Sequence, residues 1–116
     1  MSPRDWRIRI HDILNAAQSI ETYTEGMSFE EFTADSRTLD AVIRNLTVIG
    51  ESANHVPEEI CLLNAEIPWQ EMKGIRNVVV HEYFGVSPQI IWDTISIDLP
   101  QIIPSLKKLI EHGGTS

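Results

Sequence analysis

The chain has 116 residues, of which 42% are apolar and 22% charged, and its formal net charge is −8. This length predicts a single domain over residues 1–116 with one modest core, and the composition is typical of a soluble globular protein. Only nine residues are Lys or Arg, which argues against a general nucleic-acid coat protein, because such proteins gain affinity by neutralising many phosphates. A local basic pocket, assembled from two subunits, is compatible with this negative net charge.

The sequence shows no sign of membrane insertion or export. No apolar run approaches the ~20 residues that span a bilayer, and no signal-type apolar core follows the N-terminus. Cys61 is the single cysteine, so the chain cannot form an internal disulfide, which fits a reducing compartment. We therefore expect a cytoplasmic protein that makes no membrane contact.

The first predicted helix covers Pro3 to Tyr23. Its apolar residues recur at steps of three and four, which gives one wide apolar face. This face consists of Trp6, Ile10, Ile13, Leu14, Ala17 and Ile20. We expect Gly26 to end the helix. Ser28 and Glu31 then form the capping-box pattern that starts a short second helix, which we expect to end near Asp35.

The third predicted helix, Ser36 to Asn54, has the clearest amphipathic pattern. Its apolar positions are Leu39, Val42, Ile43, Leu46, Ile49 and Ala53. Glycine inside a helix costs about 1 kcal/mol relative to alanine, so Gly50 predicts close approach of another helix. Further on, Pro57 followed by Glu58 and Glu59 predicts a short helical turn, because acidic residues are favourable at a helix N-terminus.

A helix is predicted over Pro68 to Gly85, because proline suits the first helical turn and glycine suits the end. At about 100° per residue, Arg76 falls on the same stripe as the apolar residues Met72 and Val79. Tyr83 lies about two turns further along the same side. A charge in line with apolar residues is costly unless it is paired or meets an anion. Arg76 is therefore the strongest functional indication in the chain.

The last segment begins at Ser87 and Pro88, and its apolar pattern runs from Ile90 to Ile110. Pro100 and Pro104 each lack a backbone donor, so we expect a kink or break near them. Few residues in the chain alternate with the two-residue period of strands. The predicted fold is therefore all-α, an antiparallel helical bundle of four to five helices.

Arg76, Asn77 and His81 form the main candidate site. A planar guanidinium grips phosphate oxygens, and an imidazole beside it can move a proton. Asn77 and His81 are four residues apart, so the amide could hold one imidazole nitrogen and fix the tautomer. Arg76 and His81 point ~140° apart on an ideal helix, so two facing copies or a distorted helix end must bring them together. The alternative is structural: an arginine that pairs with an acid such as Glu51, near a core histidine.

The remaining side chains predict neither a metal site nor a cofactor site. There is no HExxH pattern, and one cysteine cannot make a zinc cluster. The histidines are scattered at His11, His55, His81 and His112. Glycine-rich phosphate loops and the G-x-S-x-G elbow are absent. On physical grounds alone Tyr83 is the edge of the core with its hydroxyl in solvent, and the tryptophans Trp6, Trp69 and Trp92 are core residues.

The segment Arg76-Asn77-Val78-Val79-Val80-His81-Glu82-Tyr83 resembles the signature of the HepT-like ribonuclease toxins of the HEPN superfamily. That signature is Arg, four to six residues, His, one residue and Tyr. The resemblance extends to Arg44-Asn45-Leu46, to Ile49-Gly50-Glu51 and to Ile67-Pro68-Trp69, and it covers roughly Arg4 to Glu111. It implies a helical homodimer whose paired motifs form a cleft at the subunit interface. It also implies a metal-independent endoribonuclease that cleaves transfer or messenger RNA and is neutralised by an MntA-like nucleotidyltransferase antitoxin.

The resemblance also assigns roles to the motif residues. Arg76 would bind and polarise the scissile phosphate, and His81 would be the acid–base group for attack by the RNA 2′-OH. Asn77 would orient His81, and Tyr83 would receive AMP from the antitoxin. An AMP on Tyr83 would place a negative phosphate near Arg76, where it fills the pocket and repels RNA.

Two other functions are compatible with the residues. The chain could be a non-catalytic helical dimer that serves as substrate or binding partner of a nucleotidyltransferase, which its acidic balance and few lysines favour. It could also be a nucleotide-binding module, in which Arg76 grips a phosphate and an aromatic side chain stacks on the base.

Overall fold

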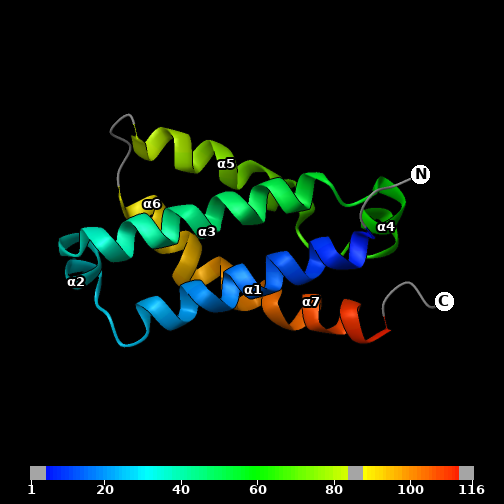
Figure 1. The fold of residues 1–116 in the computed structure, drawn as a ribbon, viewed down its shortest axis with the longest axis horizontal. Coiled ribbons are helices and arrows are strands. Elements are labelled where there is room, and N and C mark those ends of the chain that lie inside the picture. The colour runs from blue at the N-terminus through cyan, green and yellow to red at the C-terminus, as the bar shows by residue number, and fades with distance from the viewer. Residues whose placement is uncertain (1–4, 84–87, 113–116) are drawn as a thin grey trace.

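A computed structural model describes residues 5–83 and 88–112 of the chain. Within these residues every regular element is a helix (Figure 1), which confirms the predicted all-α class. The elements are α1 (Trp6–Thr24), α2 (Phe29–Ala34), α3 (Ser36–Asn54), α4 (Glu58–Leu63), α5 (Trp69–Tyr83), α6 (Pro88–Asp93), the π-helix η1 (Thr94–Asp98) and α7 (Leu99–His112).

Four long helical segments form the bundle, in agreement with the expected four to five helices. They are α1, α3, α5 and the uninterrupted run of α6, η1 and α7. Figure 1 shows that each long segment runs antiparallel to the one before it. The six-residue helices α2 and α4 lie in the connections, where a short helix and a helical turn were predicted.

Local side-chain bonds explain where the helices begin. Ser28 and Glu31 form the predicted capping box: the Glu31 N–H donates to Ser28 Oγ at 3.1 Å, and the Ser28 N–H donates to Glu31 Oε1 at 2.8 Å. Asp35 caps α3 by accepting from the Thr38 N–H at 3.1 Å, and this bond lowers the pKa of Asp35 from its ordinary value. The first helix begins at Trp6 rather than at Pro3, because Asp5 is extended and caps α1.

The connections also follow the expected turn chemistry. Gly26 has a φ of +77°, a conformation that glycine adopts without the penalty of a Cβ. Asp35 ends α2 as well as capping α3, so the two helices meet without a loop. The expected helix end at Gly85 and the expected cap at Ser87 lie outside the described residues.

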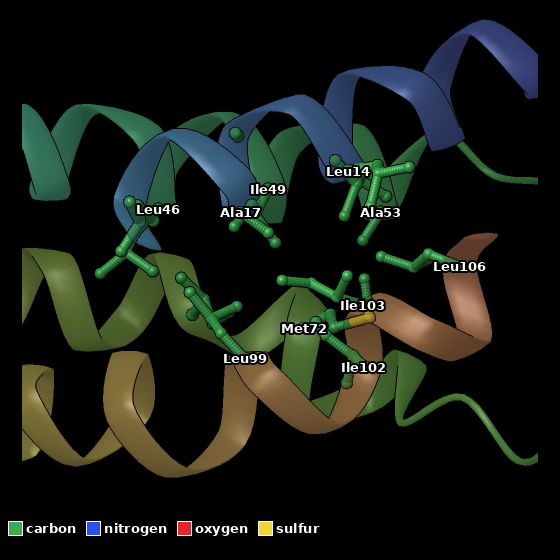
Figure 2. Close-up of a cluster of buried hydrophobic side chains, with 14 of the residues drawn as sticks. Leu14, Ala17, Leu46, Ile49, Ala53, Met72, Leu99, Ile102, Ile103 and Leu106 are labelled. Atoms are coloured by element: carbon green, nitrogen blue, oxygen red, sulfur yellow. The ribbon is translucent and has the colours of Figure 1, made fainter. Parts of the chain in front are cut away.

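Buried apolar side chains from all four long segments form the core. Helix α1 packs against α3 and α7, and α3 packs against α5. Figure 2 shows side chains from α1, α3, α5 and α7 pointing toward one another. The fully buried members include Ile10, Ile13, Ile20, Val42, Leu46, Ile49, Met72, Leu99 and Leu106. Among the tryptophans, Trp69 is buried, whereas Trp6 and Trp92 are partly buried against the core.

The last helical run accommodates its prolines in two ways. Directly before Pro100 the hydrogen bonding widens into η1, where the Leu99 N–H donates to the Thr94 carbonyl five residues earlier. This π-turn is the irregularity expected near Pro100, since a proline cannot donate to the preceding turn. Pro104 differs from the expectation, because α7 continues through it to His112.

Helices α3 and α5 approach each other closely at Gly50, as its place in the helix predicted. A Cβ added at Gly50 would lie 3.4 Å from the Arg76 backbone nitrogen, 3.5 Å from the Arg76 Cβ and 3.6 Å from the Met72 carbonyl oxygen. These are ordinary contact distances, so the site has room for one methyl group. The two helices are therefore held together at the level of Arg76.

This spacing gives a stability prediction for two substitutions at Gly50. We expect Gly50→Leu to destabilise the protein by about 1–3 kcal/mol, because the added carbons force the α5 backbone away. Gly50→Ala is the matched control and should keep or increase stability by up to about 1 kcal/mol, since alanine favours a helix. Urea unfolding of both variants measures the difference. Equal stability of the two variants would contradict the close approach.

Candidate functional site

The candidate site lies on the exposed side of α5, next to α3. Buried side chains hold α5 in place: Trp69, Met72, Ile75 and Val79 all lie in the core. The Trp69 indole N–H also donates to the Asn64 carbonyl at 3.0 Å, which fixes the start of the helix. Between these anchors, Gln70, Glu71, Arg76 and Asn77 are exposed.

Arg76 occupies one of these outward positions and pairs with α3. Its Nη1 donates to Glu51 Oε1 at 2.7 Å, across 25 residues of sequence. The side chains are 62% exposed for Arg76 and 45% exposed for Glu51. The ion pair that the sequence suggested is therefore present. The expected energetic cost of a charge on an apolar stripe does not arise, because Arg76 lies at the edge of that stripe and its side chain is largely exposed.

The structure places the other motif residues along the same helix. Asn77 is exposed and adjoins Arg76, and the backbones of His81 and Tyr83 belong to α5. The side chains of His81 and Tyr83 lie outside the described residues, so the expected Asn77–His81 bond does too. Because α5 is one continuous helix, Arg76 and His81 are separated by ~140° of rotation and about 7.5 Å of rise.

Metal-binding side chains do not gather in the described part of the chain. Within residues 5–83 and 88–112, no three His, Cys, Asp or Glu side chains lie close enough to hold a metal ion. Cys61 is buried, and this burial raises the pKa of its thiol. A raised pKa disfavours the thiolate, which is the form that binds metals.

A cavity of about 590 Å³ lies beside the first turns of α5, but its chemistry does not fit RNA. Its lining combines apolar side chains with the acidic residues Glu66, Glu71 and Asp98, whereas Arg76 and Asn77 do not line it. Three carboxylates repel a phosphate backbone. The exposed face around Arg76 is therefore the better candidate for binding an anion.

Sequence reasoning missed how Gly50 and Glu51 act together. Gly50 predicted a close helix and Glu51 was a possible partner of Arg76, yet both contacts converge on one arginine. The sequence did contain an indication of this arrangement, because a small residue, Gly50, is directly followed by an acid, Glu51, in the predicted third helix. Only the relative register of the two helices, which is a tertiary property, shows that both contacts fall on Arg76.

Comparison with known proteins identifies the family. The model of a family described as "Ribonuclease HepT-like" matches residues 13–109. The chain belongs to the HepT-like ribonuclease family. The matched region contains α3 and α5 in full, so the motif and its α3 partner both lie inside the HepT-like domain.

Several named relatives match over most of their length. A protein of Thermococcus cleftensis named "Probable ribonuclease HepT" is 39% identical over 100 residues, which are 86% of this chain and 91% of that protein. A Methanocaldococcus jannaschii protein named as a candidate RNase is 36% identical over 96% of this chain and 92% of its own. Another candidate RNase, from Caldanaerobacter subterraneus, is 33% identical over 88% of this chain and 91% of its own length. No solved structure matches the chain.

Within the described residues, no helix is both long enough and apolar enough to cross a bilayer.

The exposure of Arg76 predicts that its removal leaves the fold intact. We expect Arg76→Ala to change the free energy of unfolding by less than about 1 kcal/mol, since solvent-exposed ion pairs contribute little. Met72→Ala, one turn earlier on the buried side, should cost about 2–5 kcal/mol through cavity formation. Thermal and urea unfolding of both variants provide the test. A loss at Arg76→Ala as large as that at Met72→Ala would show that Arg76 is a structural residue.

Proposed function

We propose that this HepT-like protein is an endoribonuclease that cleaves transfer or messenger RNA without a metal ion, and that it is the toxin of a toxin–antitoxin pair. The observation that carries the proposal is the position of Arg76. Its guanidinium lies exposed on α5 inside an Arg-x4-His-x-Tyr motif, with one nitrogen held by Glu51. Family membership and the RNase names of relatives support the same activity.

The proposed reaction is an internal transesterification. His81 removes the proton from the RNA 2′-OH, whose oxygen attacks the adjacent phosphorus. The bond to the 5′-oxygen breaks, that oxygen takes up a proton, and the products are a 2′,3′-cyclic phosphate and a 5′-hydroxyl. Arg76 stabilises the negative charge that grows on the phosphoryl oxygens, and Asn77 orients the imidazole.

The helix geometry supports a site that two subunits share. On one α5 helix Arg76 and His81 diverge by ~140°, so one copy cannot easily direct both at the same phosphate. In a homodimer with two α5 helices facing each other, Arg76 of one subunit and the partner subunit's His81 can face one phosphate. A composite site also doubles the local number of cations, which matters for a chain with a net charge of −8.

Tyr83 is the proposed point of control. It stands seven residues after Arg76, so the two residues lie on the same side of α5, about 10.5 Å apart along the axis. A cognate nucleotidyltransferase antitoxin of the MntA type would transfer AMP from ATP to the Tyr83 hydroxyl and release pyrophosphate. The new phosphodiester places a negative charge within reach of Arg76 and excludes RNA. Such a pair would act in the cytoplasm, where RNA and ATP are both present.

A second candidate function follows from the charge. With a net charge of −8 the protein offers little long-range attraction to RNA. This favours a non-catalytic dimer that binds the nucleotidyltransferase and serves as its substrate. The two functions differ in one observable, which is RNA cleavage by the purified, unmodified protein.

RNA cleavage in excess EDTA tests the leading function. We expect the unmodified protein to cleave total RNA, and Arg76→Ala and His81→Ala each to lose at least about 10²-fold in rate, the scale of one acid–base or charge-stabilising group. Lys108→Ala, which removes an exposed positive charge from α7, is the matched control and should cleave like the wild type.

Intact mass must first show that Tyr83 carries no AMP. Equal cleavage by all four proteins would point to a contaminating nuclease. Absence of cleavage by the adduct-free wild type would favour the non-catalytic partner.

Incubation with the cognate nucleotidyltransferase and ATP tests the control. We expect the protein to gain the mass of one AMP and to lose RNA cleavage in proportion to the modified fraction. Tyr83→Phe should gain no mass, because it lacks the acceptor hydroxyl. Tyr23→Phe is the control, since Tyr23 is the other tyrosine of the chain and is exposed on α1. Addition of AMP to the Tyr83→Phe protein would exclude Tyr83 as the single target.

A further inference from the structure

We propose that Glu51 is a positioning residue of the nuclease site, which holds the Arg76 guanidinium in place for the scissile phosphate. This inference rests on the proposed ribonuclease function and adds a residue from α3 to a motif that lies entirely on α5. Its basis is the ion pair between Glu51 and Arg76, together with the packing of the residue that precedes Glu51.

Consecutive residues of α3 lie beside the two ends of the Arg76 side chain. At the base of the side chain, the α5 backbone approaches Gly50 so closely that an added Cβ would lie 3.5 Å from the Arg76 Cβ. At the tip, Glu51 Oε1 accepts from Arg76 Nη1 at 2.7 Å. An arginine has several freely rotating bonds between its backbone and its guanidinium, and a bond that holds the tip removes part of that freedom. The pair therefore presets the direction of the guanidinium.

The contact leaves most of the guanidinium available. A guanidinium has five N–H donors, and the bond described here uses one of them, on Nη1, for a single carboxylate oxygen. The donors on Nε and Nη2 remain in the planar fork that binds two oxygens of a phosphate. Glu51 thus orients Arg76 without taking the edge that a phosphate needs.

Glu51 is itself on a rigid support. It lies within α3, one turn before the helix end, and its carbonyl oxygen accepts from His55 Nδ1 at 2.8 Å. The neighbouring Ser52 and Ala53 are buried. The carboxylate is therefore attached to a fixed backbone, which suits a group that positions another one.

The ion pair between Glu51 and Arg76 is expected to contribute little to the stability of the fold. Both side chains are substantially exposed, at 62% and 45%, and solvent-exposed pairs contribute little to folding. An acid next to a phosphate site also repels the substrate. Removal of Glu51 should therefore affect RNA binding and the catalytic step in opposite directions, which a purely structural role would not do.

The test compares wild type, Glu51→Gln, Glu51→Ala and the control Glu21→Ala in steady-state RNA cleavage. Glu21 is an exposed acid on α1, so the control removes the same charge elsewhere. We expect Glu51→Ala to lower kcat by about 10- to 100-fold, as for a misplaced catalytic group, with KM unchanged or lower. Glu51→Gln keeps an oxygen acceptor at the same place and should retain most of the wild-type kcat.

Three outcomes would overturn the proposal. An increase in kcat for Glu51→Ala would show that Glu51 blocks Arg76 instead of positioning it. Equal losses in Glu51→Ala and Glu21→Ala would reduce the effect to net charge. A lower unfolding temperature with an unchanged kcat per folded molecule would show that the ion pair is structural.

A measurement without RNA separates this proposal from the ribonuclease function. The ¹⁵N heteronuclear NOE of the Arg76 Nε–H, assigned with Arg76→Lys, reports the order of the guanidinium. We expect an ordered group in the wild type and Glu51→Gln and a mobile one in Glu51→Ala. If the wild type cleaves no RNA, the ribonuclease proposal fails and the NOE decides the positioning alone. Equal mobility in all three proteins would overturn the positioning role.

Discussion

The close packing of α3 against α5 at Gly50 is the constraint on which the site depends. The α5 backbone passes so close to Gly50 that an added Cβ would be in van der Waals contact with the Arg76 backbone nitrogen. The next residue, Glu51, is then near enough to pair with Arg76 at 2.7 Å. A residue larger than alanine at this point is expected to push the helices apart and to separate Glu51 from Arg76. A small residue at position 50 therefore suits both the packing of α3 against α5 and the ion pair beside it.

The core and the candidate site use adjoining faces of the same helix. Met72, Ile75 and Val79 hold α5 in the bundle, while Arg76 and Asn77 face outward. A site on a helix that is fixed by a buried core is more precise than a site on a loop. The same rigidity keeps Arg76 and His81 apart in one chain, which is the physical reason to propose that two subunits complete the site.

Much of the fold was predictable because local rules decide it. The predicted helix Ser36–Asn54 has the same bounds as α3, and the predicted capping box at Ser28 is present. The helical turn predicted after Pro57 is α4. The start at Pro3 was wrong, because the cap at Asp5 is a stronger signal than a nearby proline. The continuation of α7 through Pro104 was also unexpected, since tertiary packing can stabilise a helix against local preference.

For the candidate site, the sequence suggested the ion pair of Arg76 but not the exposure of its side chain. Spacing on a helix identified Arg76 and a possible acidic partner. It also suggested that Arg76 lies in line with the core, whereas the side chain is mostly exposed. The exposure depends on how far α5 is rotated against α3, and that rotation is set by contacts between distant residues.

Subunit complementation tests the proposed shared site most directly. Arg76→Ala and His81→Ala proteins are unfolded together, refolded as a mixture, and assayed for RNA cleavage in EDTA against each protein alone. If Arg76 of one subunit acts with the partner subunit's His81, half of the dimers are mixed and each mixed dimer has one intact site. The mixture should then recover about a quarter of the wild-type rate. A mixture as inactive as its components, in which mass spectrometry shows that mixed dimers have formed, would contradict a site shared between subunits.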